Sequence, residues 1–152
     1  MRRLLLSIAF AAAALIALPR AGAAQDYRSI VVSQLDTVAG PIARSGFRAE
    51  SAVFDRDVVV GALAQGATSM LELNLVGGVN YFIPAVCDGD CSDMDLRIFS
   101  TDSTTPVGED TADDDVPMLN FTAPKSGRYM LAVDMAKCSA SICYYGFRVY
   151  RK

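Results

Sequence analysis

Histidine is absent from this sequence of 152 residues. Its absence excludes Ser-His-Asp and Cys-His catalysis, in which an imidazole is the general base, and removes the commonest transition-metal ligand. A phosphate-binding glycine loop is missing too, because the Gly-Ala-Leu-Ala-Gln-Gly stretch at 61–66 lies between expected strands and precedes no helix. Carboxylate chemistry remains, and the 17 acidic residues show no spacing that singles out a catalytic pair. We therefore expect that the protein is not an enzyme.

The sequence has a long apolar run only at its N-terminus. Two arginines precede the apolar stretch 4–18, and small residues follow at 21–24. This is the pattern of a secretory signal peptide, so we expect residues 1–24 to be a signal that is cleaved after Ala23 or Ala24. The apolar run has 15 residues, fewer than the roughly 20 that a membrane-spanning helix needs. We therefore expect no stable membrane anchor after cleavage.

The chain that remains after cleavage is acidic. Arg2, Arg3 and Arg20 would leave with the signal, so eleven basic residues face 17 acidic ones and the net charge is −6. Such a domain lacks the basic face that binds nucleic acids or anionic membranes, and we expect no nucleic-acid partner. We expect an exported protein, periplasmic or secreted, whose partner is an envelope or extracellular protein or a polysaccharide.

Four cysteines in an exported chain predict two disulfides, for which three pairings are open on sequence alone. Cys87 and Cys91 bracket one short loop, and Cys138 and Cys143 bracket another. Three expected strands separate the two loops, which would place them at opposite ends of a β-sandwich, out of reach of a long-range bridge. Local pairing is therefore favoured. A four-cysteine zinc site is disfavoured, because neither spacing is the usual two-residue knuckle.

The segment 25–46 carries one apolar stripe at intervals of four, three and four residues, which predicts an amphipathic helix. The stripe consists of Val31, Leu35, Val38 and Ile42. Asp26 is suited to begin such a helix and Gly46 to end it, whereas Pro41 is awkward inside it. A membrane-surface helix has a polar side rich in lysine and arginine. This one carries Arg28 among Ser29, Ser33, Asp36 and Thr37, so we expect the helix to pack on its own domain.

After Phe47 the apolar residues alternate with polar ones, which is the period of a half-buried strand. About seven strands are expected, at 58–63, 71–75, 81–87, 94–98, 116–121, 129–133 and 145–149. Turn residues separate these segments, and no helix-length segment lies between them, so a parallel βαβ sheet is disfavoured. The sequence predicts a mainly β domain over residues 47–152, an antiparallel β-sandwich preceded by one helix.

Three stretches resemble the bacterial pre-peptidase C-terminal domain. They are 93–98 (Asp-Met-Asp-Leu-Arg-Ile), 121–129 (Phe-Thr-Ala-Pro-Lys-Ser-Gly-Arg-Tyr) and 145–149 (Tyr-Gly-Phe-Arg-Val). The likeness covers roughly residues 65–150 and implies a small jelly-roll-like sandwich with a non-catalytic accessory role beside secreted proteases. The sequence departs from the family in the helix expected before the sandwich and in its four cysteines.

Acidic residues form two groups, and the first makes a candidate calcium site because calcium prefers oxygen ligands. The first group is Asp88, Asp90, Asp93 and Asp95; the second lies at 102–115. An EF-hand counted from Asp88 would need a glutamate at Phe99. We favour a role in solubility and strand-edge protection, and expect no cofactor. The strand count places the two groups at opposite ends of the sandwich.

Three aromatic residues are candidates for a binding surface: Phe99, Tyr144 and Tyr150. The two tyrosines alternate with core-facing positions, so they point outward or lie beneath the helix, and packing beneath the helix is the simpler interpretation. We expect an exported, non-catalytic binding or interaction module of unknown ligand. The first alternative is a structural or stability accessory of the cell envelope, and the second is a small carboxylate-dependent glycoside hydrolase.

Overall fold

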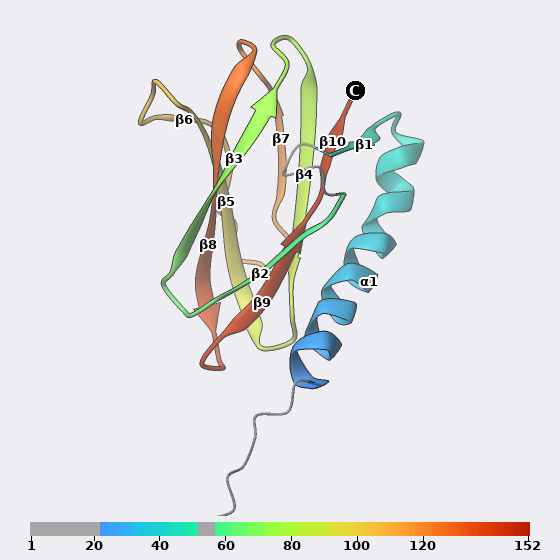
Figure 1. Ribbon diagram of the computed structural model, residues 1–152, viewed down its shortest axis with the longest axis vertical. Helices are drawn as coiled ribbons and strands as arrows, with labels where there is room; N and C mark the ends of the chain where they lie inside the picture. The colour runs from blue at the N-terminus through green and yellow to red at the C-terminus, as the bar shows by residue number, and fades with distance from the viewer. Residues whose placement is uncertain (1–21, 52–56) are drawn as a thin grey trace, which may run out of the picture.

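The computed structural model describes residues 22–51 and 57–152. Figure 1 shows two β-sheets packed face to face, with one helix lying along the outside of one sheet. The expected antiparallel sandwich preceded by a helix is confirmed. The expected signal peptide lies almost wholly outside the described residues and stays a prediction.

Helix α1 spans Gly22–Arg44 and includes Pro41. It begins earlier than the sequence predicts, so that Asp26 lies inside it and accepts a hydrogen bond from the Ser29 hydroxyl at its carbonyl oxygen. It ends where Gly46 adopts a φ of 90°, a conformation that favours glycine. Pro41 stands in the last turn, where its missing N–H costs the helix one hydrogen bond, and the helix ends three residues later. In the described ranges, the structure contains no helix with enough apolar length to cross a membrane.

Ten antiparallel strands form the two sheets in the described part of the chain. The first sheet has the order β1-β10-β4-β9-β2, with β7 on the other side of β4. Its strands are β1 (Arg48–Glu50), β2 (Val59–Leu63), β4 (Asn80–Cys87), β7 (Met118–Thr122), β9 (Cys143–Phe147) and β10 (Val149–Arg151). The second sheet has the order β3-β8-β5-β6. Its strands are β3 (Thr68–Leu75), β5 (Cys91–Ser100), β6 (Pro106–Asp110) and β8 (Gly127–Cys138).

The strand count differs from the sequence-based expectation of about seven, and β6 is the difference that matters. Its five residues, Pro-Val-Gly-Glu-Asp, look like a loop, yet they pair with β5. Four strands, β5 to β8, therefore separate the loop 88–90 from the loop 139–142. Because an even number of crossings returns the chain to its starting end, both cysteine loops lie at one end of the sandwich. The expectation of opposite ends is wrong.

The main core fills the space between the sheets, and a second, smaller cluster lies between α1 and the first sheet. Val31 and Leu35 of α1 are fully buried there against Val86 of β4. Val31 of the helix packs directly on Gly146 of β9, where an added Cβ would stand 2.5 Å from Val31 Cγ1 and 3.0 Å from the carbonyl oxygen of Val59 in β2. Only glycine permits this contact, by which α1 covers β4 and β9 of the first sheet.

Candidate binding face

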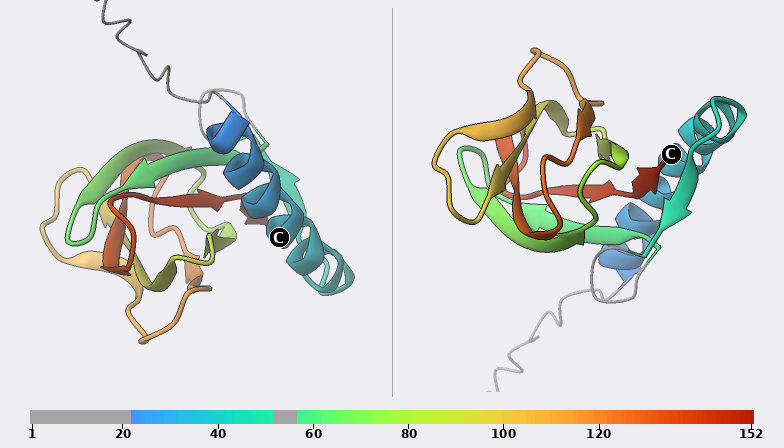
Figure 2. Two further views of the ribbon diagram at one scale, coloured as in Figure 1. Left: turned by 90° about the horizontal axis from the view of Figure 1, so that it is seen from below. Right: turned by 90° about the horizontal axis from the view of Figure 1, so that it is seen from above.

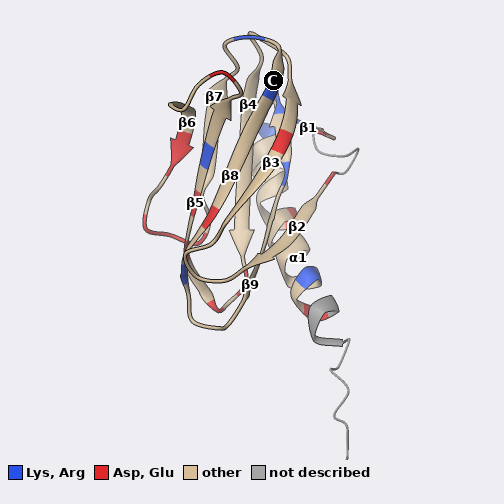
Figure 3. Ribbon diagram, turned by 60° about the vertical axis from the view of Figure 1, so that its left-hand side comes forward, with Lys and Arg blue, Asp and Glu red and all other residues tan. Residues whose placement is uncertain are grey.

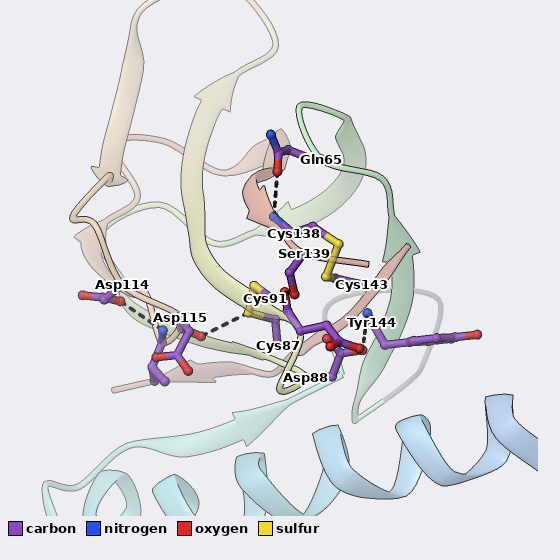
Figure 4. Close-up of a disulfide and its surroundings, with 12 residues drawn as sticks. Gln65, Cys87, Asp88, Cys91, Asp114, Asp115, Cys138, Ser139, Cys143 and Tyr144 are labelled. Carbon is purple, nitrogen blue, oxygen red and sulfur yellow. Dashed lines mark hydrogen bonds between the residues drawn. A yellow bond between two sulfur atoms is a disulfide. The ribbon is translucent and has the colours of Figure 1, made fainter. Parts of the chain in front are cut away.

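Both disulfides lie at the same end of the sandwich, where Cys87 bonds to Cys91 and Cys138 to Cys143 (Figure 4). This is the local pairing that the sequence favours. The argument that the two loops lie at opposite ends of the sandwich, however, does not hold. Cys91 stands directly opposite Cys138 in the β5–β8 pair. The Ser139 N–H and hydroxyl donate to the Asp90 carbonyl oxygen, at 2.8 and 2.9 Å. The two loops are thus fastened to each other.

Asp88, a calcium candidate, is a structural residue of this end. It is 1% exposed, and its Oδ2 accepts the Tyr144 N–H at 2.9 Å (Figure 4). Its own N–H donates to the Tyr144 carbonyl oxygen, also at 2.9 Å. Oδ1 is buried and has no hydrogen-bond partner among the described residues. The side chain therefore ties the loop that follows β4 to β9.

The other calcium candidates do not join Asp88 in one site. Asp93 forms an ion pair with Lys137 at 3.3 Å, and Asp95 lies 3.9 Å from Arg97. Over residues 22–51 and 57–152, no group of three or more His, Cys, Asp or Glu side chains is arranged to hold a metal ion. The structure therefore does not assemble the expected four-aspartate group.

The two acidic groups nevertheless meet, contrary to the expectation that they lie at opposite ends. Lys137 bonds to Asp93 of the first group and to Asp113 of the second. The cause is again β6, which brings the chain back to the disulfide end before residue 113. Asp102 alone lies at the far end, where hydrogen bonds from Lys125 and Ser100 lower its pKa to about 2.

The outer face of the second sheet is open. Figure 2 shows α1 against the first sheet, and no described helix lies against the outside of β3-β8-β5-β6. Strand register defines two rows across this face. One row is Met70, Ala132, Arg97 and Glu109; the other contains Glu72, Met130 and Phe99. We call these two rows, together with the adjacent row of Thr68, Asp134 and Asp95, the open face.

Apolar side chains and ion pairs alternate on the open face. Met70 is 51% exposed, and Phe99 is half-buried. Arg97 holds Asp134 with two hydrogen bonds, at 2.8 and 3.3 Å. Burial, together with the neighbouring Asp93, raises the pKa of Asp95 beside it. Charged and apolar side chains therefore lie side by side on this face.

The sheet that carries the open face is acidic (Figure 3). Its strands carry six carboxylates against three basic side chains. The carboxylates are Glu72, Asp93, Asp95, Glu109, Asp110 and Asp134; the basic residues are Arg97, Arg128 and Lys137. The strands of the first sheet carry only Glu50 against Arg48 and Arg151. Among the strands, the carboxylates are thus concentrated on the sheet away from the helix.

Of the three aromatic candidates, the structure places only Phe99 on the open face. The Tyr144 ring stacks on Tyr27 of α1, with centroids 4.9 Å apart and planes 4° from parallel. Tyr150 is 4% exposed. Tyr144 is half-buried beneath the helix and Tyr150 is buried, so neither lies on the open face. The sequence interpretation missed Met70 and Met130, which period-two alternation would have assigned to the outside of their strands.

A hollow lies on the other side of the molecule, between the last turns of α1 and the first sheet. Its volume is about 460 Å³, and it is lined by Thr37, Val38, Pro41, Ile42, Ser45, Phe82 and Met118. Met118 is 45% exposed. No charged side chain lines this hollow, so its chemistry differs from that of the open face.

No protein-family model matches this sequence, and no curated protein matches it significantly. The two-sheet fold is that of a pre-peptidase C-terminal domain, which confirms the resemblance seen in the sequence. The pre-peptidase C-terminal domain of a Bacillus anthracis collagenase is 20% identical, with a TM-score of 0.50 over 60% of this chain and 86% of that one. The periplasmic g-type lysozyme inhibitor PliG of Aeromonas hydrophila is 16% identical, with a TM-score of 0.46 over 62% of this chain and 84% of that one.

Proposed function

We propose that this protein is an exported, non-catalytic binding module that binds a basic protein through the open face. The asymmetry of the two sheets carries the proposal. Helix α1 covers β4 and β9 on the outside of one sheet, whereas no described helix covers the outside of the other, where Met70, Met130 and Phe99 lie among charged side chains. Apolar contacts ringed by polar groups are the usual composition of a protein-binding surface.

Several observations support a non-catalytic role. The sequence contains no histidine, and all four cysteines are bonded in disulfides, so none is available as a nucleophile. The carboxylates of Asp134 and Asp93 are engaged by Arg97 and Lys137. The fold is shared with the pre-peptidase C-terminal domain of a collagenase, and the family that the sequence resembles implies a non-catalytic accessory role. Together these features favour binding over the carboxylate-dependent hydrolase.

Charge supports a basic protein as the partner. The strands of the second sheet carry twice as many carboxylates as basic side chains. Complementary potential across an interface speeds association and excludes wrong partners. A neutral polysaccharide would gain nothing from this excess of carboxylates. A protein surface that combines apolar side chains with lysine and arginine would match both the methionines and Phe99 of the open face and its excess of carboxylates.

Two methionines provide the test, because Met70 and Met118 are similarly exposed, at 51% and 45%, on opposite sheets. The immobilised mature domain would capture partners from an envelope fraction, with and without calcium. We expect Met70→Ala combined with Phe99→Ala to weaken capture about tenfold or more, the scale of a lost interface anchor. Met118→Ala should leave capture unchanged, and raising salt from about 50 to about 300 mM should weaken it.

Two results would contradict the proposal. Capture that is lost in Met118→Ala but kept in the variant of the open face would assign the interface to the hollow beside α1. If neither the wild type nor any variant captures a protein at low salt, the alternative of a structural accessory to the envelope is favoured. A requirement for calcium would revive the calcium hypothesis, which the described geometry does not support.

A further inference from the structure

Strand β3 forms one edge of the second sheet. It pairs with β8 along all eight of its residues, and no other described strand pairs with it. The Met135 N–H donates to the Ala67 carbonyl oxygen just before β3 begins, which fixes the alternation of the ladder. Every second residue from 67 therefore bonds to β8, and the residues between turn their N–H and C=O groups to the free edge. Those residues are Thr68, Met70, Glu72 and Asn74, all exposed.

Natural proteins protect sheet edges with short strands, charges or covering segments. The edge strands β1, β2 and β6 have three, five and five residues. At β7, the Met118 N–H is taken by Asp110 Oδ2 at 2.7 Å. Strand β3 is longer, and its one charged side chain, Glu72, turns toward Arg128 of its own sheet at 3.5 Å. The charge therefore lies over the sheet and leaves the backbone edge accessible.

We infer that the partner adds an extended strand to the free edge of β3. This inference rests on the proposed function, since it describes how the same basic partner docks. An added strand bonds through its main chain, and its side chains extend the faces of the sheet it joins. Its residues opposite Met70 and Glu72 would continue the open face, and the residues between would lie over the half-buried Leu71. A partner strand fits this arrangement if its residues on the open face are basic and the residues between them, next to Leu71, are apolar.

Charge also decides against a second copy of this chain as the occupant. Pairing β3 with its own copy would place two open faces side by side in one continuous sheet. In each copy, the strands of the second sheet carry six carboxylates against three basic residues, so the second sheets of two copies would repel each other. A basic strand from another protein would instead be attracted to the same edge.

A synthetic peptide of alternating lysine and valine, as long as β3, is a suitable probe. In the free protein, we expect fast amide hydrogen exchange at Thr68, Met70, Glu72 and Asn74, whose N–H groups face outward, and slow exchange at the residues between them. The peptide should slow exchange at those four positions about tenfold or more. In an antiparallel added strand, the lysines opposite these residues carry the bonding N–H groups. N-methylation of the lysines should therefore abolish binding, and N-methylation of the valines should not.

Proline at the edge gives an independent test on the protein itself. Met70→Pro removes an outward N–H but no bond to β8, so the strand should still form. We expect it to weaken peptide binding about tenfold, the effect of one lost hydrogen bond. Met70→Thr keeps the N–H, removes the apolar side chain, and should bind the peptide nearly as well as the wild type. If Met70→Pro does not fold, the two N-methylated peptides still decide the matter on the wild type.

Three outcomes would overturn the inference. The first is equal binding of both N-methylated peptides, or no protection at millimolar peptide. The second is protection that appears without peptide as the protein concentration rises, which would identify a second copy as the occupant. The third is envelope capture that is lost in the open-face variant and kept in Met70→Pro. That result would leave the binding function in place and remove only the strand addition, so the two proposals fail separately.

Discussion

At the scale of single residues, buried polar groups at the disulfide end carry much of the local order. Asp88 has one oxygen bonded to the Tyr144 N–H and the other buried without a described partner. Burying a carboxylate costs free energy unless the carboxylate is hydrogen-bonded. Here the hydrogen bonds attach the loop 88–90 to β9, the strand on which the helix packs.

Removing the Asp88 carboxylate should therefore lower the free energy of unfolding. We expect Asp88→Ala to cost about 1–3 kcal/mol, because it leaves the Tyr144 N–H without its acceptor. Asp88→Asn keeps an acceptor oxygen and should cost less. Asp90 lies in the same loop, and its backbone carbonyl oxygen is the group that accepts hydrogen bonds from Ser139. Asp90→Ala should therefore change the free energy of unfolding by no more than about 0.5 kcal/mol. Urea unfolding measures all three; equal losses at both positions would contradict this role.

Asp95 is expected to make stability depend on pH. Burial and the neighbouring Asp93 raise its pKa above the ordinary value, so the folded protein binds this proton more tightly than the unfolded chain does. Ionised Asp95 therefore lowers stability above the raised pKa, and this cost disappears as the pH falls toward the unfolded value. Asp95→Asn should raise the melting temperature at neutral pH, with a difference that shrinks in acid.

The neighbouring Asp134 provides the control for Asp95. It accepts both hydrogen bonds from Arg97, so Asp134→Asn should lower the melting temperature at neutral pH. A neutral-pH melting temperature that is unchanged or lower in Asp95→Asn would show that the ion pair with Arg97, at 3.9 Å, outweighs the burial of the carboxylate.

At the scale of elements, the helix and the first sheet form one unit. The Asp36 carboxylate of α1 pairs with Arg148, at 2.7 Å, at the point where β9 ends and β10 begins. Gly146 leaves room for the Val31 and Leu35 side chains of the helix, which fill the contact. The covering of this sheet therefore depends on a few positions spread over both elements.

A charge placed beneath the helix should destabilise the whole domain. We expect Leu35→Asp to lower the free energy of unfolding by roughly 2–5 kcal/mol, because Leu35 is fully buried and an aspartate there lacks a partner. Ile30→Asp makes the same kind of change in the same helix, at a side chain that is 44% exposed, and should have little effect. A melting temperature equal to that of the wild type in Leu35→Asp would mean that α1 is not docked in solution.

These elements also show which parts of the fold could be predicted from sequence. The helix was predictable because Val31 and Leu35 recur at the period of one face. Strand β6 was not, because its proline, glycine and two acids resemble a loop, and only its pairing with β5 makes it a strand. That one omission reversed the ends assigned to the cysteine loops and acidic groups.

The candidate site was predictable only in part. Phe99 was identified because it is aromatic, and it does lie on the open face. Tyr144 could not be assigned correctly without the position of α1, since the same alternation fits an exposed or a covered ring. Edge status is a property of sheet order, which no local pattern reveals, so the free edge of β3 became visible only in the structure.

At the scale of the whole molecule, processing should leave the folded domain intact. Cleavage after Ala23 or Ala24 would fall in the first turn of α1, well before the buried Val31. The intact mass of the exported protein should therefore lack the first 23 or 24 residues of the sequence. A full-length species that stays in the membrane fraction would contradict the signal peptide.

The position of Cys91 opposite Cys138 has a consequence for oxidative folding. Directly opposed residues of an antiparallel pair have Cα atoms about 4.5–5.5 Å apart, a distance that a disulfide also accepts. A wrong bridge between β5 and β8 is therefore within reach of a chain that has already formed this pair. We expect reduced protein to trap this isomer when it is reoxidised, and a thiol–disulfide isomerase to raise the native yield. Non-reducing peptide mapping would detect the 91–138 peptide; if it never forms, oxidation precedes the pairing of β5 with β8, and the bridges guide the sheet.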